Sequence, residues 1–245
     1  MSAARQTCAP GQLEHGAPSA PLQKVTVQGL HALGSAMSTG GTAAAEQKTS
    51  GLPETVMAMI QARIGRLPPS ARRVLRAASV FGEIFWEKGV HRLLSSTHGD
   101  EPIRDTLEAL IREEIIEKSR EERFVKEAQY YFRHSLVRDS AYRLINEEEL
   151  TPWHAMAGKF LEDAGEREGI ILADHYRLGK DYARASLSYA RAAQQAHDAG
   201  SIDAALACVE RGLACGAAGE IRGELLTIRC QIELWREKYD QALAA

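Results

Sequence analysis

The sequence predicts a mainly α-helical chain that carries one small β-hairpin. From Leu52 onward, apolar residues recur every three or four positions over most of the chain, which is the period of an amphipathic helix. Between about residues 115 and 134 this gives way to short stretches rich in β-branched and aromatic residues, which are typical of strands. Aromatic residues make up only 6% of the chain, so Leu, Ala and Ile must supply most contacts between helices.

Residues 1–49 differ in composition from the rest of the chain. They are rich in Ala, Gly, Ser, Thr and Gln, and their last part, within SAMSTGGTAAAEQKTSG, has the composition of a flexible linker. Such a segment has too few apolar side chains to form a core of its own. We therefore expect residues 1–49 to be a disordered or linker segment.

Two helices are expected at the start of the next segment. They are indicated by LPETVMAMIQARIGRLP and SARRVLRAASVFG, with Pro53 at a helix start, the Pro68–Pro69 pair as a break and Gly82 as an end. A third helix is expected from about Phe85 to Leu94. A fourth places four apolar residues on one face: Ile103, Leu107, Leu110 and Ile111.

A hairpin and a further helix complete this segment. IIEKS and QYYFRH, separated by a charged stretch, indicate two paired strands, and LVRDSAYRLI returns to the helical period. Helices followed by a hairpin of this kind favour a winged helix. Residues 50–146 are therefore predicted to form a winged-helix-like domain.

Residues 147–245 are predicted to form a tetratricopeptide-like array of α-helical hairpins, truncated at its C-terminus. Three stretches, KDYARASLSY, SIDAALACV and KYDQALAA, each place an apolar residue three positions before an Ala. The last two copies lie 37 residues apart, close to the period of such repeats, whereas the first two lie only 20 apart. Ala residues let paired helices approach closely, and arrays of this kind bind proteins along an extended surface.

The sequence carries no motif that would make the chain an enzyme on its own. It has no GxxxxGK[ST] phosphate loop, no GxGxxG after a strand, and no GxSxG, HExxH or HRD motif. Four cysteines, Cys8, Cys208, Cys215 and Cys230, form no CxxC pair and no zinc spacing. We therefore predict no catalytic residues, no metal site and no cofactor held by this chain. His154 and His175, each in a helical stretch beside an aromatic residue, are interpreted as packing or surface residues.

Charge and hydropathy narrow the class of partner. The net charge of −3 gives no overall basic field, and the stretch 100–117 before the hairpin carries seven acidic residues against two basic ones, which would repel a phosphate backbone. Nucleic acid is therefore not expected as the partner. The chain shows neither a signal peptide nor an apolar run long enough to span a membrane, so a cytoplasmic location without membrane contact is expected.

Taken in order, several stretches resemble one family: LPETVMAMIQARIGRLPPSARRVLRAASVFGEIFW, LEALIREEIIEKS, YYFRHSLVRDSAY, WHAMAGKFLE and ADHYRLGKDYARASLSYARAAQQA. Together, over about residues 50–245, they resemble the region downstream of the nucleotide-binding core in bacterial AAA-like STAND signal-transduction ATPases. That region often accompanies serine/threonine kinase or nucleotide cyclase domains. The resemblance implies a winged helix followed by tetratricopeptide-like repeats. The ATPase core that would precede LPETV is missing, so we expect a truncated, split or mis-started member of the family, and ATP hydrolysis does not carry over.

The resemblance also gives one residue a role. A His at the end of the hairpin can face the nucleotide phosphates in that class of ATPase, and His134 occupies the matching position. It would sense ATP or ADP only in a complex with an ATPase core. The structural alternative for FRHSLVRDSAY is that Phe132, Leu136, Ala141 and Tyr142 pack the wing on the helix, while Arg138 and Asp139 face solvent or pair with neighbours.

The expected function is that of a non-catalytic regulatory and protein-interaction fragment of a STAND-type signal-transduction ATPase. In it, the winged helix couples a nucleotide-binding core to a repeat arm that binds a protein partner. Two alternatives remain open. The chain could complete a split ATP-binding protein whose core, or kinase or cyclase domain, lies on another chain. It could instead be a winged-helix transcription regulator that binds DNA.

Overall fold

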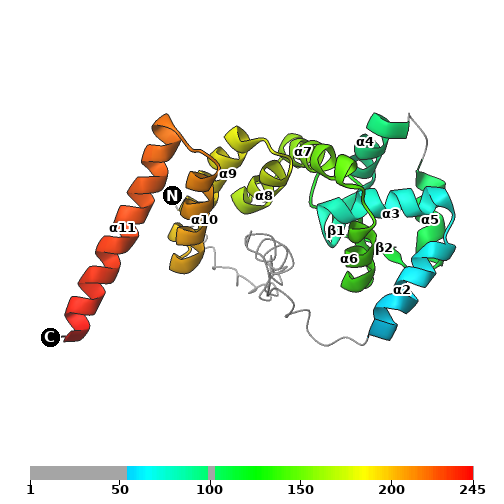
Figure 1. The fold of residues 1–245 in the computed structure, drawn as a ribbon, viewed down its shortest axis with the longest axis horizontal. Coiled ribbons are helices and arrows are strands. Elements are labelled where there is room, and N and C mark those ends of the chain that lie inside the picture. Colours follow the sequence, from blue (N-terminus) through cyan, green and yellow to red (C-terminus); the bar gives the residue numbers. More distant parts are fainter. Residues whose placement is uncertain (1–53, 99–102, 245) are drawn as a thin grey trace, which may run out of the picture.

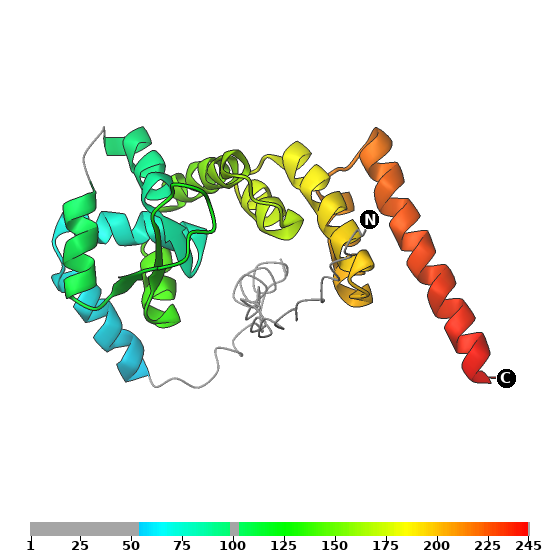
Figure 2. The same ribbon diagram turned by 180° about the vertical axis from the view of Figure 1, so that it is seen from behind.

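The computed structural model describes residues 54–98 and 103–244, so the expectation for residues 1–49 lies outside the described part of the chain. The described residues are mainly helical, with a small three-stranded antiparallel sheet, which confirms the predicted fold class. Figures 1 and 2 show an arched molecule in which the sheet and its helices form one end and a long C-terminal helix forms the other. None of the described helices has the length and apolar surface that a membrane-spanning segment needs.

The end of the arch that holds the sheet, described over residues 54–98 and 103–143, is called the winged half after the winged helix that the sequence predicts for it. Helices α2 (Glu54–Arg66) and α3 (Pro69–Phe81) come first, followed by strand β1 (Ile84–Trp86) and helices α4 (Glu87–His98) and α5 (Arg104–Arg112). The hairpin β2 (Ile116–Lys118) and β3 (Gln129–Phe132) and helix α6 (Ser135–Arg143) complete it. The sheet order is β1-β3-β2, so β3 pairs with both neighbours.

Strand β1 corrects one sequence expectation. A helix was expected from about Phe85, but residues Ile84–Trp86 pair with Tyr131–Gln129 of β3, and helix α4 begins only at Glu87. Both aromatic side chains of β1 are buried: Phe85 packs on Tyr130 and Phe132, with ring centroids 5.7 and 5.3 Å away, and Trp86 packs on Phe124 at 4.8 Å. Successive side chains of a strand point to opposite faces, so Phe85 and Trp86 are both buried because both faces of β1 are covered. The partner strand lies more than 40 residues away, so local periodicity does not reveal it.

Helices α7 to α11 extend the molecule away from the sheet. They are α7 (Glu147–Ala164), α8 (Gly169–Leu178), α9 (Tyr182–Asp198), α10 (Ile202–Ala214) and α11 (Gly219–Ala244). The first of them packs on the winged half, and the last four, α8 to α11, are called the helical arm. Each helix packs on the next, and α11 also contacts α9. Buried residues from Ile64 to Ile232 form one continuous core that runs through both halves of the molecule.

Two of the three repeat copies begin a helix, and the third does not. Tyr182 starts α9 and Ile202 starts α10, and Ala185 and Ala205 are fully buried, as expected for close helix contacts. Tyr239, in contrast, lies inside the unbroken helix α11. The difference has a local reason. Gly179 precedes the first copy and Gly200, with a φ of +72°, precedes the second, whereas the helix formers Glu237 and Lys238 precede the third.

Glycines set how closely α8 approaches its neighbours. A Cβ at Gly169 would lie 2.6 Å from the backbone N of Ala192 and 2.8 Å from the carbonyl O of Ser188, both on α9. A Cβ at Gly179 would lie 2.6 Å from the backbone N of Ala155 on α7. Because these neighbours are backbone atoms, they can move only if whole helices move. α8 is therefore held against both α7 and α9 by contacts that require glycine.

Gly169→Ala should consequently destabilise the protein, by about 1–3 kcal/mol, because the new methyl group forces α8 and α9 apart. Gly223→Ala is the matched control, since a Cβ at Gly223 meets nothing within 4 Å inside helix α11. That change should stabilise the protein by up to about 1 kcal/mol, the difference in helix propensity between Gly and Ala. Urea unfolding of both variants measures the two free energies. If both substitutions change the free energy of unfolding in the same direction, α8 and α9 do not approach each other closely at Gly169.

Candidate functional site

His134, the residue assigned to phosphate sensing by resemblance, lies at the surface. It is the N-cap of α6, with an extended backbone at φ −137° and ψ 126°, and its side chain is exposed and caps nothing. Among the described residues it makes no side-chain hydrogen bond or ion pair. The position is therefore open to a partner, but nothing in the described chain holds the imidazole in one orientation.

The rest of FRHSLVRDSAY is mostly structural, with one departure from expectation. Phe132 and Ala141 are buried, as predicted. Arg138 pairs with a neighbour, which is one of the two arrangements expected for it, because its Nη2 lies 3.1 Å from Asp139 Oδ1. It does not face solvent, however: it is 5% exposed, and its Nε has no hydrogen-bond partner among the described residues. Arg138 is therefore an internal charge of the winged half. The sequence did not show that Arg138 lies on the inner face of α6, because buried and exposed residues are mixed within this stretch.

Tyr142 leads from this motif into a buried chain of hydrogen bonds. Its hydroxyl lies 2.8 Å from Nε2 of His154 on α7, and Nδ1 of His154 lies 3.1 Å from Nδ1 of His175 on α8. His154 is 2% exposed and His175 is 1% exposed. Three consecutive helices, α6, α7 and α8, are thus joined by one polar chain in the interior.

The two imidazoles can form this chain only while at least one of them is neutral. A hydrogen bond between two Nδ1 atoms needs one N–H between them, so one ring donates and the other accepts. Burial lowers the pKa of His175 to about 4. Burial, followed by the charges of His175 and Arg177, lowers the pKa of His154 well below its usual 6.5. Both rings are therefore neutral near pH 7, although Nε2 of His175 is buried without a partner.

The space for His175 is made by a glycine and by aromatic rings. A Cβ at Gly158 of α7 would lie 3.2 Å from the Cβ of His175 and 3.1 Å from the ring of Tyr176, so a larger residue at 158 would press on α8. The ring of Phe81 on α3 lies 6.3 Å from the imidazole of His175. The histidine pair therefore lies where α3, α7 and α8 meet.

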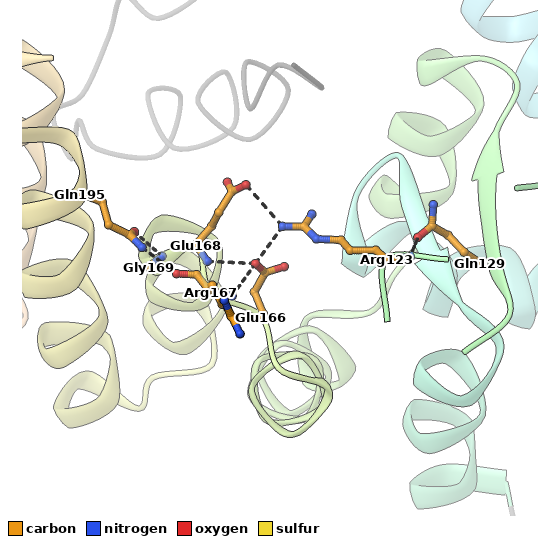
Figure 3. A network of polar contacts seen from close by, with 7 residues as sticks. All are labelled: Arg123, Gln129, Glu166, Arg167, Glu168, Gly169 and Gln195. Carbon is orange, nitrogen blue, oxygen red and sulfur yellow. Dashed lines mark hydrogen bonds and ion pairs between the residues drawn. The ribbon is translucent and has the colours of Figure 1, made fainter. Parts of the chain in front are cut away.

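A second polar cluster joins the hairpin loop to the turn between α7 and α8 (Figure 3). Nη2 of Arg123, in the loop between β2 and β3, lies 2.8 Å from Oε1 of Glu166 and 3.4 Å from Oε1 of Glu168. Glu166 is 6% exposed, and the same Oε1 also accepts the backbone N–H groups of Arg167 and Glu168, at 2.8 and 2.9 Å. One buried carboxylate thus organises the turn and binds the wing.

The cluster reaches helix α9 as well. The side-chain oxygen of Gln195 accepts the backbone N–H of Gly169 at 2.9 Å, and its amide donates to the carbonyl of Arg167 at 2.7 Å. At the other end, the side chain of Gln129 on β3 accepts the backbone N–H of Arg123 at 3.3 Å. Sheet, hairpin loop, turn and α9 are therefore linked. We call the histidine chain and this cluster together the junction.

The contacts of the junction hold neighbouring helices and the hairpin loop in one arrangement. No group of three or more His, Cys, Asp or Glu side chains among the described residues is arranged to hold a metal ion. The histidine pair is sealed from solvent, and its described partners are a tyrosine and an aromatic ring. What the arrangement can do is fix the angle between the winged half and the helical arm.

The sequence patterns singled out Tyr142, His154 and His175 without connecting them, and they did not single out Arg123 or Glu166. His154 and His175 were each interpreted as packing or surface residues, and the structure buries both. A pair 21 positions apart on two helices gives no local signal that the two rings meet. Arg123 and Glu166 lie 43 positions apart in charged stretches that resemble solvated surface. In the sequence, the nearest indication that α7 and α8 touch is the presence of Gly158 and Gly179, which set how closely the two helices approach.

Glu166→Ala should destabilise the protein by about 1–3 kcal/mol, because the change leaves two backbone N–H groups of the turn and Arg123 without their acceptor. Glu168→Ala is the control in the same turn. Its carboxylate is half-exposed and has one long contact, so the loss should stay within about 0.5 kcal/mol. Urea unfolding at pH 7 gives both values, and a larger loss for Glu168→Ala would contradict the role given to Glu166.

Comparison with known proteins adds no family to this geometry. No match was found among family models, among curated proteins or among solved structures. The resemblance to STAND-type ATPases therefore stays a prediction from the sequence.

Proposed function

We propose that this chain is a non-catalytic regulatory and protein-interaction module in which the winged half is coupled to a helical arm that binds a protein partner. The observation that carries the proposal is the junction. Glu166 ties the hairpin loop to the α7–α8 turn, and the histidine chain ties α6 to α8. A displacement imposed on the winged half is then passed to the arm.

Aromatic packing supports the same coupling. The ring of Phe160 on α7 lies 5.8 Å from Phe81 and 6.3 Å from Trp86, so α7 is packed into the core of the winged half. On its other side, α7 touches α8 through Gly158 and Gly179. Interfaces within a chain that are large and apolar restrict relative motion. The two halves are therefore expected to move as one body.

The arm offers apolar surface to a partner. Large apolar side chains are exposed on α9 and α11: Tyr182, Leu187, Leu226, Leu234 and Trp235. Trp235 is 71% exposed, although α11 buries Leu225, Ile228 and Ile232 against α9 and α10. Exposed aromatic residues such as Trp235 and Tyr182 are enriched where proteins bind one another. A protein partner on the arm fits these side chains.

The proposed setting follows from the resemblance. The module would act in the cytoplasm of a bacterium, beside the ATPase core of a STAND-type protein and its kinase or cyclase domain. ATP or ADP would enter only through that core. DNA binding is the weaker alternative, because the exposed residues of α5 include Asp105 and Glu108, while Arg104 is drawn to Glu87 at 3.2 Å.

One observation favours the alternative of a split ATP-binding protein. His134 is exposed at the uncapped N-terminus of α6, where a phosphate brought by another chain could meet it. Backbone N–H groups at a helix N-terminus attract such anions. In that case His134→Ala would weaken nucleotide binding by the assembled complex. The fold would be unchanged, because the exposed side chain makes no hydrogen bond or ion pair with a described residue.

The isolated chain should bind neither ATP nor ADP, since it has no phosphate loop. Calorimetric titration of the full chain with each nucleotide should give no heat of binding up to millimolar concentration. A dissociation constant in the micromolar range for the chain alone would contradict the proposal of a non-catalytic module.

Coupling between the halves can be measured directly. Spin labels at Ala62→Cys on α2 and Ala214→Cys on α10, both exposed positions, report the distance across the junction in a chain whose Cys8, Cys215 and Cys230 are replaced by Ser. We expect one narrow distance distribution at pH 7, a broader one with Glu166→Ala, and no change with Glu168→Ala. A broad distribution without any junction substitution would show that the halves are not coupled.

A further inference from the structure

The contact between His154 and His175 depends on how many protons the two rings carry. Their Nδ1 atoms lie 3.1 Å apart, and this distance accommodates one N–H between two nitrogens. If both rings become imidazolium ions, each Nδ1 carries a proton, and two N–H groups and two positive charges then face each other. The contact cannot persist in that state, so the two rings must move apart.

The groups around the pair offer nothing to neutralise an added charge. Tyr142 of α6 faces Nε2 of His154, and Phe81 of α3 covers His175. Arg177 of α8 adds positive charge near His154, as Arg138 of α6 does near Tyr142. Three further charged groups on the helices packed around the pair have partners of their own: Asp174 of α8 with Tyr189 of α9, Arg76 of α3 with Glu149 of α7, and Arg92 of α4 with Asp163 of α7.

Among the described residues, no carboxylate bonds to either imidazole. We propose that the His154–His175 contact is a proton-operated latch, which holds α8 against α7 while the rings are neutral and releases the helical arm when both are protonated. The latch rests on the proposed coupling for its biological meaning, because it would disconnect the winged half from the arm. The opening itself is a property of the chain and needs no partner.

The sign of the effect follows from the two states. In the open state both rings meet water and have a pKa of about 6.5, whereas burial lowers the pKa of both in the closed state, that of His175 to about 4. Above pH 6.5 neither state takes up protons, so opening does not depend on pH. Below it the open state gains protons first. By pH 5 the opening constant rises about 30-fold for each ring that is still neutral in the closed state, and therefore about 1,000-fold when both are.

Amide hydrogen exchange of the full chain tests the latch. After correction for the intrinsic rate, protection of the amides in α8 should fall by about two to three orders of magnitude between pH 7 and pH 5. Protection in α3, which belongs to the core of the winged half, should fall far less over the same range. Equal losses in both helices would mean global unfolding, and unchanged protection in α8 would mean that no latch exists. Either result overturns the proposal.

Substitutions separate titration from packing. His154→Asn and His175→Asn each keep a polar atom near the Nδ1 position and remove one titrating ring. Each should reduce the slope of the logarithm of the opening constant against pH from about two protons toward one. His134→Asn, on an exposed ring, should leave the slope unchanged. A single-ring variant that keeps the wild-type slope would show that the pair does not operate the opening.

If these variants do not fold, the wild-type chain still decides. With 15N-labelled histidine, the closed state should show a nitrogen–nitrogen coupling across the Nδ1 pair at pH 7, and neither ring should titrate near pH 6.5. Titration of either buried ring at that pH overturns the latch. This outcome is distinct from failure of the proposed function, which a broad distance distribution at pH 7 would reveal.

Discussion

The arrangement of the whole chain depends on the packing of helix α7 between the winged half and α8. Phe160 packs against both Phe81 and Trp86, and a Cβ at Gly89 of α4 would meet its ring at 3.0 Å, so α7 has little freedom on that side. On the other side, Gly158 brings His175 and Tyr176 against the α7 backbone. Both contacts are close-packed, and close-packed interfaces do not slide by small amounts.

Polar groups complete what apolar packing begins. Apolar contacts hold α7 in place but do not define one angle, because many side-chain arrangements bury a similar area. Hydrogen bonds are directional and costly to leave unmade in the interior. Glu166, with three donors on one carboxylate oxygen, and the Tyr142–His154–His175 chain therefore select one angle between the halves. The same directionality makes the histidine chain sensitive to an added proton.

The stretch FRHSLVRDSAY does not gather its polar side chains into one site. FRHSLVRDSAY contains the residue types of a catalytic cluster, but its members point to different places. His134 is exposed, Arg138 is buried, and Tyr142 bonds to a histidine on the next helix. An α6 helix packed on α2 and α3 distributes its side chains by helical rotation, about 100° per residue, so neighbours in sequence rarely act together.

The sequence by itself determined the elements whose signals are local. The period of apolar residues predicted α2, α3 and α5, proline and glycine marked the bounds of α2 and α3, and aromatic and β-branched residues predicted the β2–β3 hairpin. Ala185 and Ala205 were predicted at close helix contacts and are fully buried. Only the tertiary structure decided that Ile84–Trp86 is a strand, that α11 continues through Tyr239, and that His154 meets His175. Each of these depends on a partner distant in sequence or on the absence of a break, and the free energy of such contacts appears only when the helices are packed.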